Sequence, residues 1–274
     1  MIITDQFVML NLPKTGSSFA RKAIKLLYKN RFDKLTLSRK LTIKLKLSKP
    51  LLCEYILPNI RIKGVKRHPD HHGTYCQIPE KHKQKKIFSI ARNPYDRLLS
   101  AYEFKGWARN PPISKELIAK LFPQFPELSL NEFLEMSRMT VKQELRDRTQ
   151  HVCIGPQSVQ FIFMFFKNPE NVLKNITDCY IDSDEYLKDM ANITFLRQEY
   201  LREDMKSFLQ KYGFNQHELR IVDELGVINE TKNKSENRNA LLTPEAIDYI
   251  NIEERFVLKI LRQKGIEYSS PKIV

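Results

Sequence analysis

The sequence of 274 residues has few cysteines, and their spacing excludes several kinds of site. Cys53, Cys76, Cys153 and Cys179 lie far apart and form no C-x-x-C pair. Zinc sites and thiol redox motifs need cysteines at short spacing, so neither kind of site is expected. We expect free, buried thiols, as in a protein of a reducing compartment, and no metal site.

Long apolar runs are also missing. No stretch of 18 consecutive apolar residues occurs, although a membrane-spanning helix needs about that many. The first residues lack the basic stretch and apolar run of a signal peptide. We therefore expect no transmembrane segment and a cytoplasmic location.

Acidic residues are scarce in the first third of the chain. Residues 1–90 hold 20 Lys and Arg against 5 Asp and Glu, whereas residues 91–274 hold 26 against 27. Nearly all of the net charge of +14 therefore lies in the first third. This predicts a positive field around a site for a polyanion, with a solvated lysine-rich surface as the alternative. Nucleic acid is not an expected partner, because no nucleic-acid-binding motif appears.

A motif typical of anion binding stands near the start. Residues 13–18 read P-K-T-G-S-S, between an apolar run at 7–10 and a helix-like run at 19–27. A strand, a glycine turn and a helix in this order direct backbone N–H groups, hydroxyls and the Lys14 ammonium towards one point. The motif is not a Walker A loop, because the opening glycine is missing and the lysine precedes Gly16.

A second motif follows a predicted buried strand at 87–91. Residues 92–102 read R-N-P-Y-D-R-L-L-S-A-Y, and Pro94 favours a helix that begins there. Arg92 then ends the strand, and Ser100 lies about two turns into the helix. An arginine and a serine so placed can hold two sides of a second phosphate.

The two motifs in this order resemble those of sulfotransferases that use 3′-phosphoadenosine 5′-phosphosulfate (PAPS), most closely the carbohydrate-type and bacterial members. The resemblance implies that Arg92 and Ser100 bind the 3′-phosphate of PAPS. It also implies that the first motif binds the 5′-phosphosulfate through Lys14, Thr15, Gly16, Ser17 and Ser18.

Weaker resemblance continues downstream. Residues 193–204 are similar to the family's late strand and the helix after it. Residues 228–232 resemble its H-x-N-x-[ST]-[KR] segment, with the histidine absent. This implies that Asn229 and Lys232 close over the nucleotide; a flexible polar loop is the alternative.

Two kinds of catalytic residue are expected. Lys14 would stabilise the charge that builds on the leaving phosphate oxygen during sulfuryl transfer. A base would take the proton of the acceptor hydroxyl. His72-Gly73-Thr74 resembles an H-x-[ST] segment of bacterial relatives, which makes His72 the first choice and His71 the second. The remaining candidates are His68, Glu54 and Glu103, and ordinary solvent exposure is the alternative for all three histidines.

Alternating strands and helices predict an α/β fold, with a P-loop-like parallel sheet flanked by helices, in a single domain over residues 1–274. Ligands of such sheets bind at the carboxyl ends of the strands, where both motifs lie. Residues 29–50 are expected to form an exposed strand or an amphipathic piece, and residues 157–166 a buried helix or strand. A last helix is expected from the cap Thr243 to about Lys264.

The sequence thus predicts an enzyme that moves a sulfuryl group from PAPS to a hydroxyl of a glycan or glycolipid, releasing adenosine 3′,5′-bisphosphate. One alternative is a basic polyanion-binding module with a relic nucleotide-binding fold, which would bind heparin-like polymers but not PAPS. Another is a P-loop phosphotransferase using ATP. That class needs a Walker A lysine and an acidic strand end for magnesium, and neither is apparent.

Overall fold

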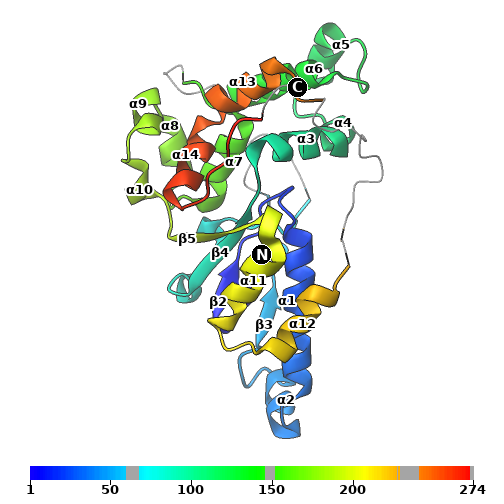
Figure 1. Cartoon of the computed structure of the whole chain (residues 1–274), viewed down its shortest axis with the longest axis vertical. Coiled ribbons are helices and arrows are strands. Elements are labelled where there is room, and N and C mark those ends of the chain that lie inside the picture. Colours follow the sequence, from blue (N-terminus) through cyan, green and yellow to red (C-terminus); the bar gives the residue numbers. More distant parts are fainter. Residues whose placement is uncertain (60–67, 146–151, 227, 229–240, 272–274) are drawn as a thin grey trace. The chain divides into compact units, whose positions relative to one another are not determined.

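The computed structural model divides the chain into two compact units (Figure 1). It describes residues 1–59, 68–145, 152–226, 228 and 241–271. Within these, the first unit comprises residues 1–59, 68–92, 192–226 and 228, and the second comprises residues 93–145, 152–191 and 241–271. The single-domain organisation over residues 1–274 stays a prediction.

The first unit is built on a five-stranded sheet in the order β3-β1-β2-β4-β5. Its strands are β1 (Ile2–Thr4), β2 (Phe7–Met9), β3 (Leu52–Glu54), β4 (Lys86–Ala91) and β5 (Ile193–Arg197). The α/β class is confirmed, and β2, β4 and β5 are parallel as expected. Beside this parallel part the sheet is mixed, because β1 is antiparallel to both β2 and β3. Only two residues join β1 to β2, and so short a connection requires an antiparallel pair.

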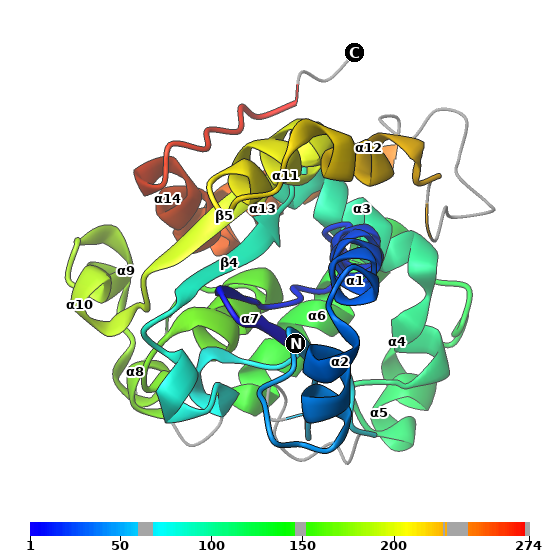
Figure 2. The same ribbon diagram turned by 90° about the horizontal axis from the view of Figure 1, so that it is seen from below.

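Helices of the first unit cover one face of this sheet (Figures 1 and 2). The unit contains α1 (Ser17–Asp33), α2 (Leu37–Lys44), α11 (Leu201–Gln210), α12 (Gln216–Glu224) and the short 3-10 turns η1 (Tyr75–Gln77), η2 (Glu80–His82) and η3 (Gln198–Tyr200). The rings of Phe7, Phe88 and Phe208 meet between the sheet and α11, with the Phe7 and Phe208 centroids 5.4 Å apart. This apolar contact holds α11 against β2 and β4.

Residues 29–50 do not form the exposed strand that was one of the two expectations for them. The exposed strand suggested within residues 29–50 is wrong, because α1 continues to Asp33 and α2 follows, with the Thr36 hydroxyl accepting from the Arg39 N–H as its cap. The alternation of leucine and isoleucine there belongs to an amphipathic helix.

The four cysteines are free, as expected, but their expected burial is wrong. Cys53 is half-buried, and Cys76, Cys153 and Cys179 are exposed.

The second unit is helical. Its helices are α3 (Pro94–Phe104), α4 (Gly106–Arg109), α5 (Lys115–Leu121), α6 (Leu130–Glu144), α7 (Pro156–Phe165), α8 (Pro169–Asn175), α9 (Asp178–Asp182), α10 (Tyr186–Asp189), α13 (Pro244–Glu253) and α14 (Arg255–Gln263). Residues 157–166 thus form a helix, α7, almost wholly buried. In the described part of the chain, no helix is both long and apolar enough to cross a membrane.

The last helix is not continuous, contrary to expectation. It breaks between α13 and α14 at Glu254, a fully buried residue. The carboxylate of Glu254 accepts hydrogen bonds from the backbone N–H groups of Gln157 and Ser158 and from the Ser158 hydroxyl, at 2.7 to 2.9 Å. A Cβ on Gly155 would lie 2.3 Å from this carboxylate, so only glycine allows the approach. The break therefore places a carboxylate at the N-terminus of α7, where a negative charge is favourable.

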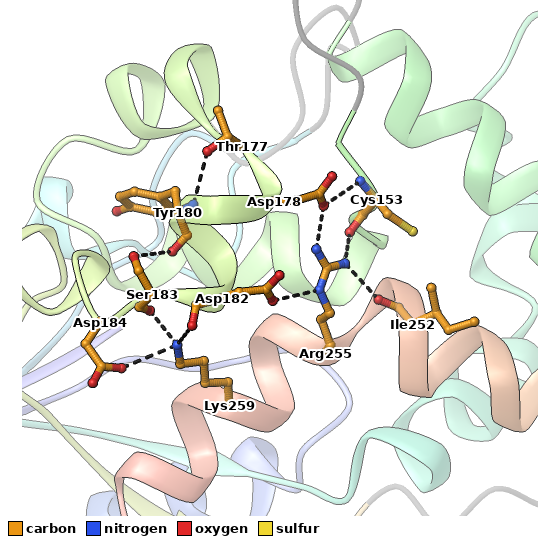
Figure 3. Close-up of polar contacts among 10 residues, drawn as sticks. All are labelled: Cys153, Thr177, Asp178, Tyr180, Asp182, Ser183, Asp184, Ile252, Arg255 and Lys259. Atoms are coloured by element: carbon orange, nitrogen blue, oxygen red, sulfur yellow. Dashed lines mark hydrogen bonds and ion pairs between the residues drawn. The ribbon is translucent and has the colours of Figure 1, made fainter.

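The two helices α9 and α14 are joined by two cations (Figure 3). The Arg255 guanidinium contacts the carboxylates of Asp178 and Asp182 and donates to the carbonyls of Cys153 and Ile252. One turn later, Lys259 donates to the carbonyls of Asp182 and Ser183 and pairs with Asp184. Lys259 thus satisfies two carbonyls at the end of the short helix α9, and Arg255 holds two carboxylates of that helix.

The buried Glu254 predicts a pH dependence of stability. Burial raises the pKa of its carboxyl from 4.5 to about 7, against the opposing hydrogen bonds from Gln157 and Ser158. A folded pKa above the unfolded one means that stability is full below pH about 4.5 and declines as the pH rises to about 7. The loss should reach about 3 kcal/mol. Urea unfolding from pH 4.5 to 8 should show this decline in the native protein and a flatter profile in Glu254→Gln. An equal slope in both proteins would contradict the assignment.

Candidate active site at the ends of three parallel strands

The carboxyl ends of β2, β4 and β5 lie next to one another in the sheet, and a polar residue stands within two positions of each end. The Leu10 N–H donates to the Phe88 carbonyl at 2.9 Å, and the buried Ser89 hydroxyl donates to the Leu10 carbonyl at 2.7 Å. These bonds continue the pairing of β2 with β4 past the last paired residues. The P-K-T-G-S-S loop and Arg92 therefore begin at the same edge, although 70 residues and more separate them in the sequence.

The loop at residues 13–18 has the backbone of a tight turn fixed from within. Lys14 and Gly16 both have positive φ angles, 65° and 79°. The hydroxyls of Thr15 and Ser17 both donate to the Leu12 carbonyl, at 2.8 and 3.1 Å, and both side chains are buried. In this structure these two hydroxyls thus shape the loop. The half-exposed Ser18 lies in the first turn of α1.

Gly16 stands directly before α1 and caps it with no side chain. The first N–H groups of a helix have no acceptor within the helix, and they carry the positive end of its dipole, so they favour an anion. A Cβ on Gly16 would lie 3.3 Å from both Gln198 Cγ and Leu201 Cδ2, which follow β5. Close packing and a positive φ thus both call for glycine at this position.

Arg92 joins the second motif to the first. Its Nη1 donates to the Lys14 carbonyl at 3.2 Å, which places a guanidinium against the turn that carries the Lys14 ammonium. Ser100, the expected partner of Arg92, belongs to the second unit, where it is buried on α3. Its role in holding the same phosphate stays a prediction. Asn229 and Lys232 lie outside the described residues.

His72 is held in an orientation that suits a base. Its backbone N–H donates to Asp70 Oδ1 at 2.7 Å, and its Nδ1 lies 2.6 Å from the Asn11 carbonyl. A carbonyl can only accept, so Nδ1 carries the hydrogen. In the neutral imidazole, the lone pair is then on Nε2. Asn11, which directly follows the apolar run of β2, thereby fixes the tautomer of His72.

His71 lies in a different environment. Its carbonyl accepts from Asn11 Nδ2 at 2.9 Å, and its Nδ1 lies 3.3 Å from Glu54 Oε1. Burial and the nearby Arg21 charge lower the pKa of His71, despite the opposing Glu54 carboxylate. A lowered pKa favours the neutral imidazole, which is the form that a base needs.

Glu54, on the edge strand β3, is an ion-pair partner. Its carboxylate lies 2.6 Å from Lys25 Nζ and 3.5 Å from Arg21 Nε. Burial raises its pKa, but the Lys25 hydrogen bond and the charges of Lys25, Arg21 and His71 together hold it below its ordinary value. A carboxylate so stabilised takes up a proton poorly. Of the other candidates, His68 is exposed in the first unit and Glu103 lies on α3 in the second.

Two residues of this site were missed by the sequence reasoning. Asn11 holds both histidines, and Arg21 sets the charge around Glu54. A buried polar residue directly after an apolar strand was the only available signal for Asn11. Arg21 is one of many cations on α1, and nothing in the sequence separates it from its neighbours.

Comparison with known families decides the general class. A model described as the sulfotransferase family matches residues 2–240, which cover both anion motifs, the histidine segment and all five strands. The chain belongs to the sulfotransferase family. No curated protein and no solved structure matches it. The protein is therefore a transferase of sulfuryl groups, and the resemblance seen in the two motifs is confirmed at the level of the family.

Proposed function

We propose that this sulfotransferase takes its sulfuryl group from PAPS and transfers it to a hydroxyl of a carbohydrate-like acceptor, a glycan or a glycolipid. The observation that carries the proposal is the hydrogen bond between Arg92 and the backbone of Lys14. It brings a guanidinium, an ammonium and the N-terminus of α1 to one edge of the sheet. Three positive groups at one edge suit a donor with phosphates at both ends of its ribose.

The chain's own residues fit the chemistry of the transfer. The acceptor oxygen forms a bond to sulfur while the bond between sulfur and the phosphate oxygen breaks. Lys14 would stabilise the negative charge that appears on that phosphate oxygen. The hydroxyl proton would pass to Nε2 of His72, which the Asn11 carbonyl leaves unprotonated in the neutral ring.

Charge supports the proposal on the acceptor side. The excess of Lys and Arg in residues 1–90 favours an acceptor with negative charges of its own.

The two rival functions require sequence and structural features that differ from those of this chain. A phosphotransferase using ATP needs a Walker A loop, and residues 13–18 do not follow that pattern. A polyanion-binding module needs the basic surface but neither the strained loop nor an oriented histidine.

Mutations at the two anion motifs should separate chemistry from binding. Lys14→Ala should lower kcat about 10²–10³-fold, because it removes one charge that acts at the transition state. Arg92→Ala should chiefly weaken binding of adenosine 3′,5′-bisphosphate, by about 10–100-fold, because it removes a charged hydrogen-bond donor. Initial rates with PAPS and calorimetric titration with the bisphosphate measure the two effects.

Lys22→Ala is the matched control for Lys14→Ala. Lys22 is an exposed lysine on α1 beyond its first turn, and its loss should change neither kcat nor bisphosphate binding. Near-normal turnover of Lys14→Ala would overturn the role of Lys14. A loss in Lys22→Ala as large as that in Lys14→Ala would show a diffuse effect of charge.

A conservative variant isolates the proton transfer. His72→Asn retains a side-chain N–H for the Asn11 carbonyl but has no basic nitrogen, so turnover should fall about 10²–10⁴-fold with bisphosphate affinity unchanged. Activity of the native enzyme should decline at low pH, because a protonated imidazole cannot take up the proton of the hydroxyl. His68→Ala, a change at an exposed histidine, should leave the rate intact. Full activity of His72→Asn together with an inactive His71→Ala would transfer the role to His71.

A further inference from the structure

A second feature of the first unit lies in residues 34–49, called here the basic leucine segment. It comprises α2 and the turns on either side, and it follows the end of α1 (Figure 1). Six cations and no carboxylate occur in it: Lys34, Arg39, Lys40, Lys44, Lys46 and Lys49. The α2 helix buries none of its residues, so the core of the first unit does not explain its composition.

The segment exposes four leucines on a well-defined backbone. Leu37, Leu41 and Leu45 are 84%, 57% and 59% exposed, and Leu47 is 76% exposed. The first three are spaced by four residues and therefore lie along one side of the helix. Exposed large apolar side chains are normally scattered singly over a surface, so an ordered stripe of them marks an interaction site.

The ends of α2 are fixed by specific bonds, which makes the stripe a feature of the fold. Thr36 caps its start. At its end, the Lys46 N–H donates to the Ile43 carbonyl and the Leu47 N–H donates to the Thr42 carbonyl, with Lys46 at φ 59°. This pair of bonds is a Schellman motif, which turns the chain back over the last turn of the helix. Leu47 is thereby returned towards the side of Leu41.

Cations border the leucines on the helix. Successive residues of a helix are rotated by 100°, so Lys40 and Lys44 stand at one edge of the leucine stripe. Lys40 donates to the Asp33 carbonyl, and Arg39 donates to the Ser48 hydroxyl; among the described residues, neither pairs with a carboxylate. Long basic side chains at the edge of an apolar stripe are the pattern of helices that lie in a membrane interface.

The positive charge continues beyond the helix into a cavity. Lys49, at the end of the segment, lines a cavity of about 350 Å³ together with Lys81, His82 and Lys85, and with Asp5 as its one carboxylate. Burial, together with the mutual repulsion of these cations, lowers the pKa of His82 and of Lys85. An anionic surface over this side of the unit would relieve that repulsion.

We propose that the basic leucine segment docks the protein onto a lipid bilayer that carries anionic headgroups, with Leu37, Leu41 and Leu45 entering the interface and the cations contacting the headgroups. Nucleic acid and acidic polysaccharides match the charge but offer nothing to the leucines. A bilayer surface matches both features at once. The proposal does not depend on the identity of the sulfuryl donor, because none of these residues belongs to the candidate active site.

Vesicle sedimentation of the full chain tests the proposal. The protein should sediment with vesicles of phosphatidylcholine and phosphatidylglycerol, and much less with phosphatidylcholine alone, because the headgroup charge is required. Salt should weaken the binding by screening that charge. If the native protein sediments with neither kind of vesicle, the proposal is wrong.

Matched variants separate the leucines from the charge. The triple variant Leu37→Ser, Leu41→Ser, Leu45→Ser should lose binding by about tenfold per leucine. Lys40→Gln with Lys44→Gln should weaken it by about fivefold per lysine. The control is Leu121→Ser with Leu187→Ser, two leucines of the second unit that are 46% and 45% exposed. That control should bind as the native protein does. Circular dichroism should show all the variants folded, because the replaced leucines and lysines lie outside the core.

Fluorescence and polymer binding distinguish a lipid bilayer from heparin or DNA as the partner of the segment. Leu41→Trp should give a blue-shifted emission with anionic vesicles, after subtraction of the signal of the native protein with its single Trp107. Unchanged vesicle binding by the triple serine variant would overturn the proposal and assign the segment to polyanions in general. Binding to heparin or DNA that depends equally on the leucines would also overturn it, because those polymers do not take up apolar side chains.

Discussion

The candidate site depends on the parallel pairing of β2 with β4. The register places Phe7 opposite Lys86, Val8 opposite Ile87 and Met9 opposite Phe88. A shift of this register by one residue would turn the side chains of one strand, Met9 or Phe88 among them, to the other face and move Arg92 away from Lys14. The apolar side chains between the sheet and α11 thus fix the register, and through it the positions of both anion motifs.

Polar contacts then orient the side chains that pairing brings together. Lys14 takes a positive φ in a loop that Thr15 and Ser17 hold by bonding to Leu12. A left-handed backbone at a lysine costs about 1 kcal/mol or more, and such strain is concentrated at functional sites. At the same end of β2, Asn11 holds the histidine segment in place. The residues that follow β2 therefore support both the anion loop and the expected base.

The sequence predicted correctly those structural features that depend on residues close together in the chain. The turn at Gly16, the helix beginning at Pro94 and the helical end at Gly265 follow from local rules on glycine, proline and spacing. The family itself followed from the two motifs. Features that depend on distant residues were not predicted. Glu254 breaks the last helix because Gly155, almost a hundred residues earlier, leaves room for its carboxylate.

The histidine segment shows the same limit within the site. The resemblance of residues 72–74 to an H-x-[ST] segment put His72 first and His71 second, but both are histidines in a polar stretch. Their difference comes from the Asn11 carbonyl on one side and from Arg21 and Glu54 on the other. Glu54 was a reserve base in the sequence, and only the structure shows that Lys25 and Arg21 neutralise it. Ion pairs between residues far apart in the chain cannot be predicted from a single sequence unless those residues belong to a known motif.

The most direct measurement of the central claim is the thermal stability of the protein with three nucleotides compared at equal concentration. If the edge formed by Lys14, Arg92 and α1 binds PAPS, adenosine 3′,5′-bisphosphate should stabilise the fold by roughly 2.7 kcal/mol at about 100 times its Kd. Adenosine 5′-phosphate and ATP should stabilise it much less, because each lacks the 3′-phosphate that Arg92 is expected to hold. An equal or larger effect of ATP would contradict the account.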